Sequence, residues 1–131
     1  MLLYIFAVMY LCFSHLDKMP DVPKVLFGIQ TDKIAHFCMF FPFPILGFFA
    51  YDRLTDTPLK AFAAIITILA IGGIFAGLTE MVQGAMPYRT EDIHDYYADL
   101  IGLGLASILV FVIDLSKMKK SGNRLSKGNA R

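Results

Sequence analysis

Apolar runs alternate along the chain with short polar segments, and this pattern predicts a bundle of membrane-spanning helices. Each run comes close to the ~20 mostly apolar residues that a helix needs to cross a bilayer, or the ~17 that suffice when flanking groups reach the interface. The four windows are residues 1–16, 33–51, 61–79 and 95–114. We therefore expect an all-α fold, a four-helix transmembrane bundle.

The overall composition excludes an ordinary soluble domain. The chain has 131 residues, of which 56% are hydrophobic, and its mean hydropathy is +0.59. The first window has no basic residues before its apolar core and no small-residue cleavage site after it, so we interpret it as a span and not as a signal peptide. Cys12 and Cys38 lie in apolar windows, and their spacing indicates neither a disulfide framework nor a zinc site.

The last part of the chain differs from the rest in charge. After Asp114 it carries six basic residues and no acid. We assign residues 1–115 to the membrane domain and residues 116–131 to a basic tail, whose Ser, Gly and Asn content is typical of disorder. The positive-inside rule makes this tail cytoplasmic, and with four spans the N-terminus is cytoplasmic too. No basic patch is interleaved with aromatic residues, so nucleic acid is not an expected partner.

Acidic residues gather on one face of the fourth window. At about 100° per residue, Asp92, Asp95 and Asp99 lie within an arc of about 60°, and Gly102 and Ala106 continue the same stripe. Small residues mark the places where membrane helices touch. We therefore expect the carboxylates to face other helices and not the lipid.

The second and third windows repeat this arrangement, which predicts one polar cluster at the extracytoplasmic end of the bundle. Gly73 and Gly77 share a helix face with Glu80, and Asp32 lies one turn before His36. The residues expected to bind a ligand there are Asp32, Lys33, His36, Glu80, Gln83, Arg89, Asp92, Asp95 and Asp99. A carboxylate in hydrocarbon costs at least ~2.5 kcal/mol, so these groups need partners, protons, a metal or water.

Several of these residues also have a purely structural interpretation. Asp32 and Asp92 are placed to cap helix N-termini. Asp99 can serve as a hydrogen-bonding contact between helices, and Arg89 as one half of a salt bridge. Because acids outnumber bases in the set, we expect some carboxylates to be protonated or to bind a cation.

The motifs, taken together, resemble the VanZ-like family of small bacterial membrane proteins. The matching pieces are DKIAHF at 32–37, E-x-x-Q at Glu80 and Gln83, then Arg89, Asp95, Asp99 and Gly102. The resemblance implies four helices, the bacterial inner (cytoplasmic) membrane, and a link to resistance against the glycopeptide teicoplanin. Asp99 stands where the family usually has Asn, so it is either ionised or a protonated donor that imitates the amide.

The favoured function is a binding protein for the headgroup of a cell-envelope lipid, such as a polyprenyl-linked precursor. Lys33 and Arg89 would bind phosphate, and the acids would contact sugar hydroxyls or amino groups. The alternative is an enzyme on the same lipids. Its catalytic candidates are His36, Glu80 and Asp95, and a divalent cation, the one cofactor that the residue types suit, would be bound by His36, Glu80 and Asp99. An ion-coupled transporter, which would need an oligomer, and a structural module are the remaining hypotheses.

Overall fold

The computed structural model describes residues 1–13, 24–51, 57–87 and 92–129, and it shows an all-α membrane protein. The elements are α1 (Leu2–Phe13), β1 (Val25–Leu26), β2 (Ile29–Gln30), α2 (Thr31–Phe40), α3 (Pro42–Tyr51), α4 (Pro58–Gly84) and α5 (Ile93–Asn129). Among the described residues, three helical segments are long and apolar enough to cross a membrane: Thr31–Ala50, Pro58–Gly84 and Ile93–Ser121. The predicted all-α bundle is confirmed.

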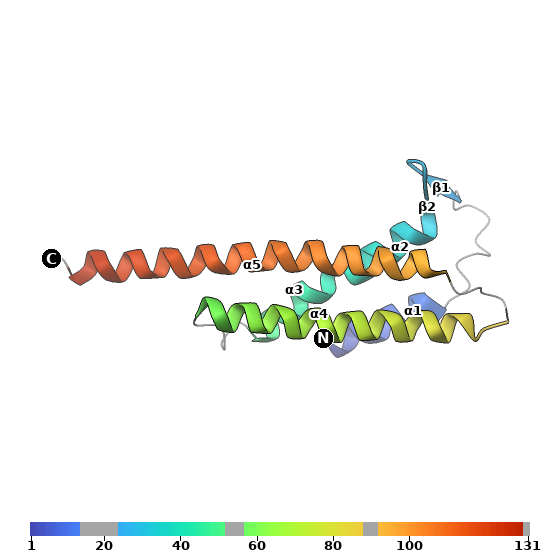
Figure 1. The fold of residues 1–131 in the computed structure, drawn as a ribbon, viewed down its shortest axis with the longest axis horizontal. Coiled ribbons are helices and arrows are strands. Elements are labelled where there is room, and N and C mark those ends of the chain that lie inside the picture. Colours follow the sequence, from blue (N-terminus) through green and yellow to red (C-terminus); the bar gives the residue numbers. More distant parts are fainter. Residues whose placement is uncertain (14–23, 52–56, 88–91, 130–131) are drawn as a thin grey trace.

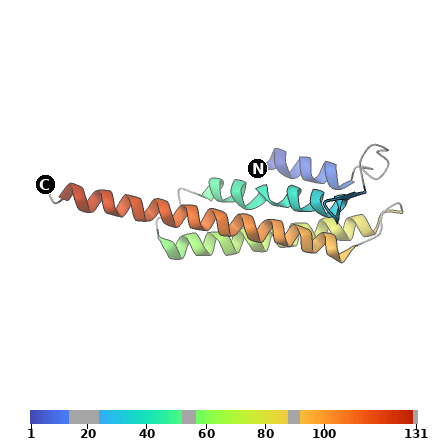
Figure 2. The same ribbon diagram turned by 90° about the horizontal axis from the view of Figure 1, so that it is seen from above.

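The helices lie side by side and alternate in direction (Figures 1 and 2). One end of the bundle holds the β1–β2 hairpin, the start of α2, the end of α4 and the start of α5 (Figure 1). The end of α5 lies far from the hairpin (Figure 1). Within the described chain, α5 packs most extensively against α2 and α4. Residues of α2 and α4 can therefore meet residues of α5 in one place.

The first helix is shorter than the span that the sequence predicts. Helix α1 has 12 residues, Leu2–Phe13, and the predicted window continues to residue 16, beyond the residues described at this point. The hydroxyl of Tyr4 donates a hydrogen bond to the carbonyl oxygen of Met39, which ties α1 to α2. Crossing of the membrane by α1 therefore stays a prediction.

The second span is interrupted where the sequence predicts a bend. Helix α2 ends at Phe40 and α3 begins at Pro42. Pro42 and Pro44 have no backbone N–H, so the helical hydrogen bonds to the carbonyls four residues earlier are missing. Phe41 still donates to the carbonyl oxygen of Phe37 over 2.9 Å, which closes the last turn of α2.

The closest approach of a helix to the backbone of another lies between α5 and α2 among the described residues. A Cβ atom at Gly102 would lie 2.8 Å from the carbonyl oxygen of Phe37 and 3.2 Å from the amide nitrogen of Phe41. On α4, a Cβ at Gly73 or Gly77 would lie 3.7 Å from the nearest α5 side chain, an ordinary contact. The predicted small-residue faces do meet α5, but the closest approach to a backbone is at Gly102, while a Cβ at Gly72 would lie 2.7 Å from the side chain of Leu103.

The last helix is longer than predicted. Helix α5 runs to Asn129, so it includes most of the segment 116–131 that the sequence analysis assigns to a disordered tail. The tail contains Lys, Met, Leu and Arg, which are good helix formers, and basic residues are favourable near a helix C-terminus. These local preferences extend a helix that is already nucleated, because propagation costs less than initiation. The division into a membrane domain and a cytoplasmic tail stays a prediction.

A short hairpin precedes α2. Val25 pairs with Gln30 and Leu26 pairs with Ile29 in an antiparallel register. Phe27 and Gly28 form its turn, with φ angles of 54° and 81°, as in the two-residue turns that match strand twist. The sequence analysis predicts no strand here. The hairpin leads directly into Thr31, so it sets where α2 and its polar residues begin.

Candidate functional site

Polar side chains from three helices meet inside the hairpin end of the bundle. The most deeply buried members are His36 on α2, Glu80 on α4, and Asp95 and Asp99 on α5, and none of them is more than 6% exposed. We call the following set the polar cluster: Asp32, Lys33, His36, Glu80, Asp92, Asp95 and Asp99. The convergence that the helix faces predict is therefore present among the described residues.

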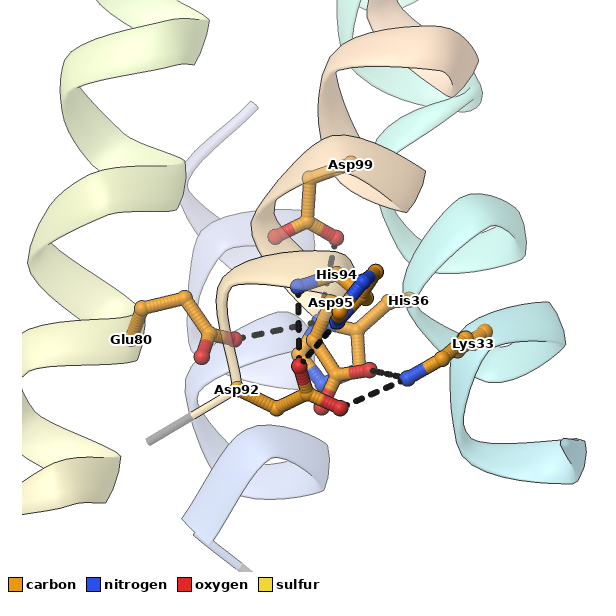
Figure 3. Close-up of polar contacts among 7 residues, drawn as sticks. All are labelled: Lys33, His36, Glu80, Asp92, His94, Asp95 and Asp99. Atoms are coloured by element: carbon orange, nitrogen blue, oxygen red, sulfur yellow. Dashed lines mark hydrogen bonds and ion pairs between the residues drawn. The ribbon is translucent and has the colours of Figure 1, made fainter. Parts of the chain in front are cut away.

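His36 is the centre of the polar cluster (Figure 3). Its Nδ1 atom lies 3.0 Å from Oδ1 of Asp99 and 3.5 Å from Oε1 of Glu80. The side chains of His36 and Asp99 are 1% and 0% exposed. One ring nitrogen thus faces carboxylates from two other helices, which links α2, α4 and α5 through a single imidazole.

Lys33 lies at the rim of the polar cluster and is paired twice. Its Nζ atom lies 2.7 Å from Oδ2 of Asp92 and 3.0 Å from Oδ1 of Asp95. Its side chain is 23% exposed, which leaves the ammonium partly hydrated. Two carboxylates therefore already neutralise the cation that the sequence analysis assigns to phosphate binding.

Asp92 has a structural role at the start of α5. Its Oδ1 accepts hydrogen bonds from the backbone N–H of His94 over 2.9 Å and lies 2.8 Å from the Nδ1 atom of the same residue. The hydrogen bond from Lys33, and then those from His94, lower the pKa of Asp92 well below its usual range. Both carboxylate oxygens of Asp92 thus have partners, as expected of a helix cap.

Two buried polar atoms in the cluster have no hydrogen-bond partner among the described residues. They are Nε2 of His36 and Oδ2 of Asp99. Buried polar groups are nearly always satisfied, so such atoms indicate a proton, water or ligand that completes the site. The polar cluster contains five carboxylates, one lysine and one histidine, so the missing partner is better matched by a cation or a donor than by an anion.

His36 belongs to two groups of side chains whose atoms are close enough to bind one metal ion. Ligand atoms of His36, Glu80 and Asp99 all lie within 4.8 Å of one another, and so do those of Asp32, His36 and Asp95. The first set is fully buried, whereas Asp32 in the second set is half-buried. The cluster therefore has a ligand arrangement that can hold a cation.

Two of the predicted ligand-binding residues, Gln83 and Arg89, are not placed in the polar cluster. The side-chain amide of Gln83 donates a hydrogen bond to the carbonyl oxygen of Cys12 over 2.8 Å, which ties α4 to α1. Gln83 is buried at 2% exposure, so its donor is committed to holding α1. Arg89 lies outside the described residues.

Two further buried polar residues on α5 are not among the predicted site residues. Ser107 is 2% exposed and Asp114 is 4% exposed. Asp114 lies beside an apolar groove that Phe48, Val110 and Lys117 help to line. The sequence pattern placed Asp114 at the end of a span, where an acidic residue is ordinary. Because α5 continues past it, Asp114 is instead inside the packed part of the helix.

The chain is similar to a protein of fission yeast. The uncharacterized protein C11E3.10 of Schizosaccharomyces pombe is 31% identical over 119 residues, which are 90% of this chain and 67% of that protein. No protein-family model matches the chain. No solved structure matches it. The resemblance to the VanZ-like family therefore stays a prediction based on the motifs alone.

Proposed function

The chain belongs to the same family as the uncharacterized protein C11E3.10 of Schizosaccharomyces pombe, and we propose that it is a membrane protein whose polar cluster binds a lipid headgroup. One observation carries this proposal: His36 is 1% exposed, faces carboxylates from two other helices, and has a ring nitrogen without a partner among the described residues. Such groups inside apolar helices are costly, and in membrane proteins they usually mark a functional site.

The proposed topology places the polar cluster in the outer leaflet of a bacterial cytoplasmic membrane, with both termini in the cytoplasm. The basic residues between 116 and 131 support this orientation. The cluster lies at the opposite end of α5 from those residues (Figure 1). A headgroup would reach it at the hairpin end, where the helices α2, α4 and α5 begin or finish.

The charges of the polar cluster restrict the headgroup chemistry. Carboxylates can accept hydrogen bonds from sugar hydroxyls or amino groups. Lys33 is already paired with Asp92 and Asp95, so its positive charge is largely compensated and one of its three N–H groups is left for a phosphate oxygen. The resemblance to VanZ-like proteins and teicoplanin resistance suggests a polyprenyl-linked envelope precursor. A family member in fission yeast favours a phosphate-bearing lipid that bacteria and fungi share.

Native mass spectrometry of the purified protein tests this proposal. We expect the wild type to retain a specific lipid through detergent exchange, and Glu80→Gln to lose it. Asp114→Asn is the matched control, because Asp114 is an equally buried carboxylate outside the polar cluster. If the wild type carries only bulk lipids in their membrane proportions, or if both variants behave alike, the proposal is wrong.

The second candidate is an enzyme that acts on polyprenyl phosphates or related lipids. The pairing of His36 with Asp99 over 3.0 Å favours it, because a carboxylate that orients an imidazole is a recurring acid/base arrangement. Incubation with a polyprenyl monophosphate, followed by measurement of released phosphate, would detect this activity. We expect an enzyme to release phosphate in the wild type and to lose at least ~100-fold in rate in His36→Gln.

A further inference from the structure

The proposed binding of a phosphate-bearing lipid leaves a charge problem that the polar cluster itself does not solve. Its five carboxylates face one lysine, which is paired with Asp92 and Asp95, and one histidine. A phosphate placed beside them would be repelled unless a positive charge is added. The deepest part of the cluster offers ligands for such a charge.

Two separations inside the first ligand set are those of atoms that share a metal ion. Metal–ligand distances of about 2.0–2.2 Å place neighbouring ligand atoms about 2.8–3.6 Å apart in octahedral or tetrahedral geometry. Nδ1 of His36 lies 3.0 Å from Oδ1 of Asp99 and 3.5 Å from Oε1 of Glu80. The oxygens of Asp99 and Glu80 also lie within 4.8 Å of each other, so a closing of these side chains would bring the three atoms into one coordination shell.

Independent evidence comes from an unsatisfied carboxylate oxygen. Oδ2 of Asp99 is buried and has no hydrogen-bond partner among the described residues. Asp99 is 0% exposed, so bulk water does not satisfy the second oxygen. A cation bound by the carboxylate would compensate the buried charge, which is the usual requirement for an ionised group in a low-dielectric site.

We propose that His36, Glu80 and Asp99 bind one divalent cation, and that this cation supplies the positive charge for the lipid phosphate. The inference rests on the proposed function. One imidazole and two carboxylates are typical ligands for Zn²⁺ or Mn²⁺. Three protein ligands leave coordination positions open, as in sites where a metal binds an exogenous oxygen. A phosphate oxygen would occupy one of these positions.

The second ligand set, Asp32, His36 and Asp95, links the buried cation site to Lys33 at the rim of the polar cluster. Asp32 and Asp95 share His36 with the first set, within the same 4.8 Å limit. Asp95 also accepts from Lys33, which is partly exposed. Lys33 and the cation would then be linked through Asp95 and His36 within the polar cluster.

Binding of Mn²⁺ to the full-length protein in detergent, measured by electron paramagnetic resonance after treatment with a chelator, tests the cation site. We expect the wild type to bind about one Mn²⁺ per chain, and Zn²⁺ to compete for it. Asp99→Asn and Glu80→Gln should each weaken binding at least ~10-fold, while Asp114→Asn should bind as the wild type does. Absence of Mn²⁺ binding and of Zn²⁺ on elemental analysis of the wild type would overturn the inference, as would equal weakening in Asp114→Asn.

A second measurement separates this inference from the proposed function. A polyprenyl monophosphate in the micelle should produce a ³¹P coupling in the bound Mn²⁺ spectrum, and inorganic phosphate should not displace it. A lipid retained equally before and after chelation would overturn the role of the cation while the proposed function stands. Stoichiometric Mn²⁺ with no ³¹P coupling and no retained lipid would support the cation site and refute lipid binding. Coupling from inorganic phosphate alone would assign the site to free phosphate and overturn the lipid part.

Discussion

Nδ1 of His36 lies 3.0 Å from Oδ1 of Asp99, and these two side chains are 1% and 0% exposed. The residues are separated by 63 positions in the sequence and lie on α2 and α5. This contact is therefore a buried polar link between the two helices, whatever else binds beside it. A polar link of this kind is stabilising while both partners are present, and costly when one partner is removed.

Two replacements of Asp99 should separate the contribution of its hydrogen bond to stability from the contribution of its charge. Asp99→Asn keeps an oxygen that can accept from His36, whereas Asp99→Ala leaves the imidazole unpaired and opens a cavity. We expect Asp99→Ala to lower the free energy of unfolding by about 1–3 kcal/mol more than Asp99→Asn does. Thermal unfolding of the two variants in the same detergent, without added metal, measures the difference. Equal melting temperatures would show that the contact contributes nothing to stability.

Replacement of Gly102 should push α5 away from α2. The new Cβ would lie 2.8 Å from the carbonyl oxygen of Phe37, and a backbone atom cannot move aside as the end of a side chain can. We expect Gly102→Ala to lower the free energy of unfolding by about 1–3 kcal/mol, the usual cost of overpacking. Because Asp99 lies one turn from Gly102, the same change should weaken ligand binding.

Gly104→Ala is the control for this prediction. No atom lies within 4 Å of a Cβ built at Gly104, so alanine there should be neutral or stabilising by up to ~1 kcal/mol through its higher helix propensity. The melting temperatures of both variants, measured side by side, test whether Gly102→Ala is the less stable of the two. A Gly102→Ala protein as stable as Gly104→Ala would mean that α2 and α5 do not pack as described.

The meeting of His36, Glu80 and Asp99 could be predicted from the sequence because helical periodicity fixes which side chains share a face. A carboxylate inside an apolar run must also face protein and not lipid. The pairing of Lys33 could not be predicted in the same way. Its partners Asp92 and Asp95 depend on where the start of α5 lies relative to α2, and this position results from many packing contacts.

Helix contacts and helix ends were harder to predict. Gly73 and Gly77 form the recognisable small-residue motif, yet the closest approach to a backbone is at Gly102, because the rotation of each helix about its axis decides which glycine meets a backbone. The break between Phe40 and Pro42 followed directly from proline chemistry. The continuation of α5 to Asn129 could not be predicted in this way, because the composition of the basic segment favours disorder.

The salt bridge between Lys33 and Asp92 should make stability depend on pH in the acid range. The pKa of Asp92 is lowered in the folded protein, mainly by the hydrogen bond from Lys33. The stabilising effect is therefore complete above the unfolded pKa of about 4 and is lost as the pH falls further. We expect Asp92→Asn to melt below the wild type at pH 7, and the gap to shrink between pH 4 and pH 2. A gap that stays constant over this range would contradict the assignment.

The hydrogen bond from Gln83 to Cys12 should hold α1 against α4. The amide nitrogen lies 2.8 Å from the carbonyl oxygen, and both residues are buried. Gln83→Met keeps the length of the side chain but removes the donor, so the buried hydrogen bond to the carbonyl of Cys12 is lost at a cost of about 1–3 kcal/mol. We expect this loss to appear as opening of α1 and not as unfolding of the remaining helices, because α1 makes the fewest contacts with the bundle among the described helices.

The thiol of Cys12 reports this opening directly. Cys12 is 0% exposed and Cys38 is exposed, so a Cys38→Ser background leaves one buried thiol to follow with a maleimide reagent. Labelling should be slow in that background and at least ~5-fold faster when Gln83→Met is added, which is the change expected for a loss of about 1 kcal/mol in local stability. Thr67→Ala is a suitable control, since its hydroxyl bonds only to its own helix at Ala63. Equal labelling rates in all three proteins would show that α1 is held by apolar packing alone.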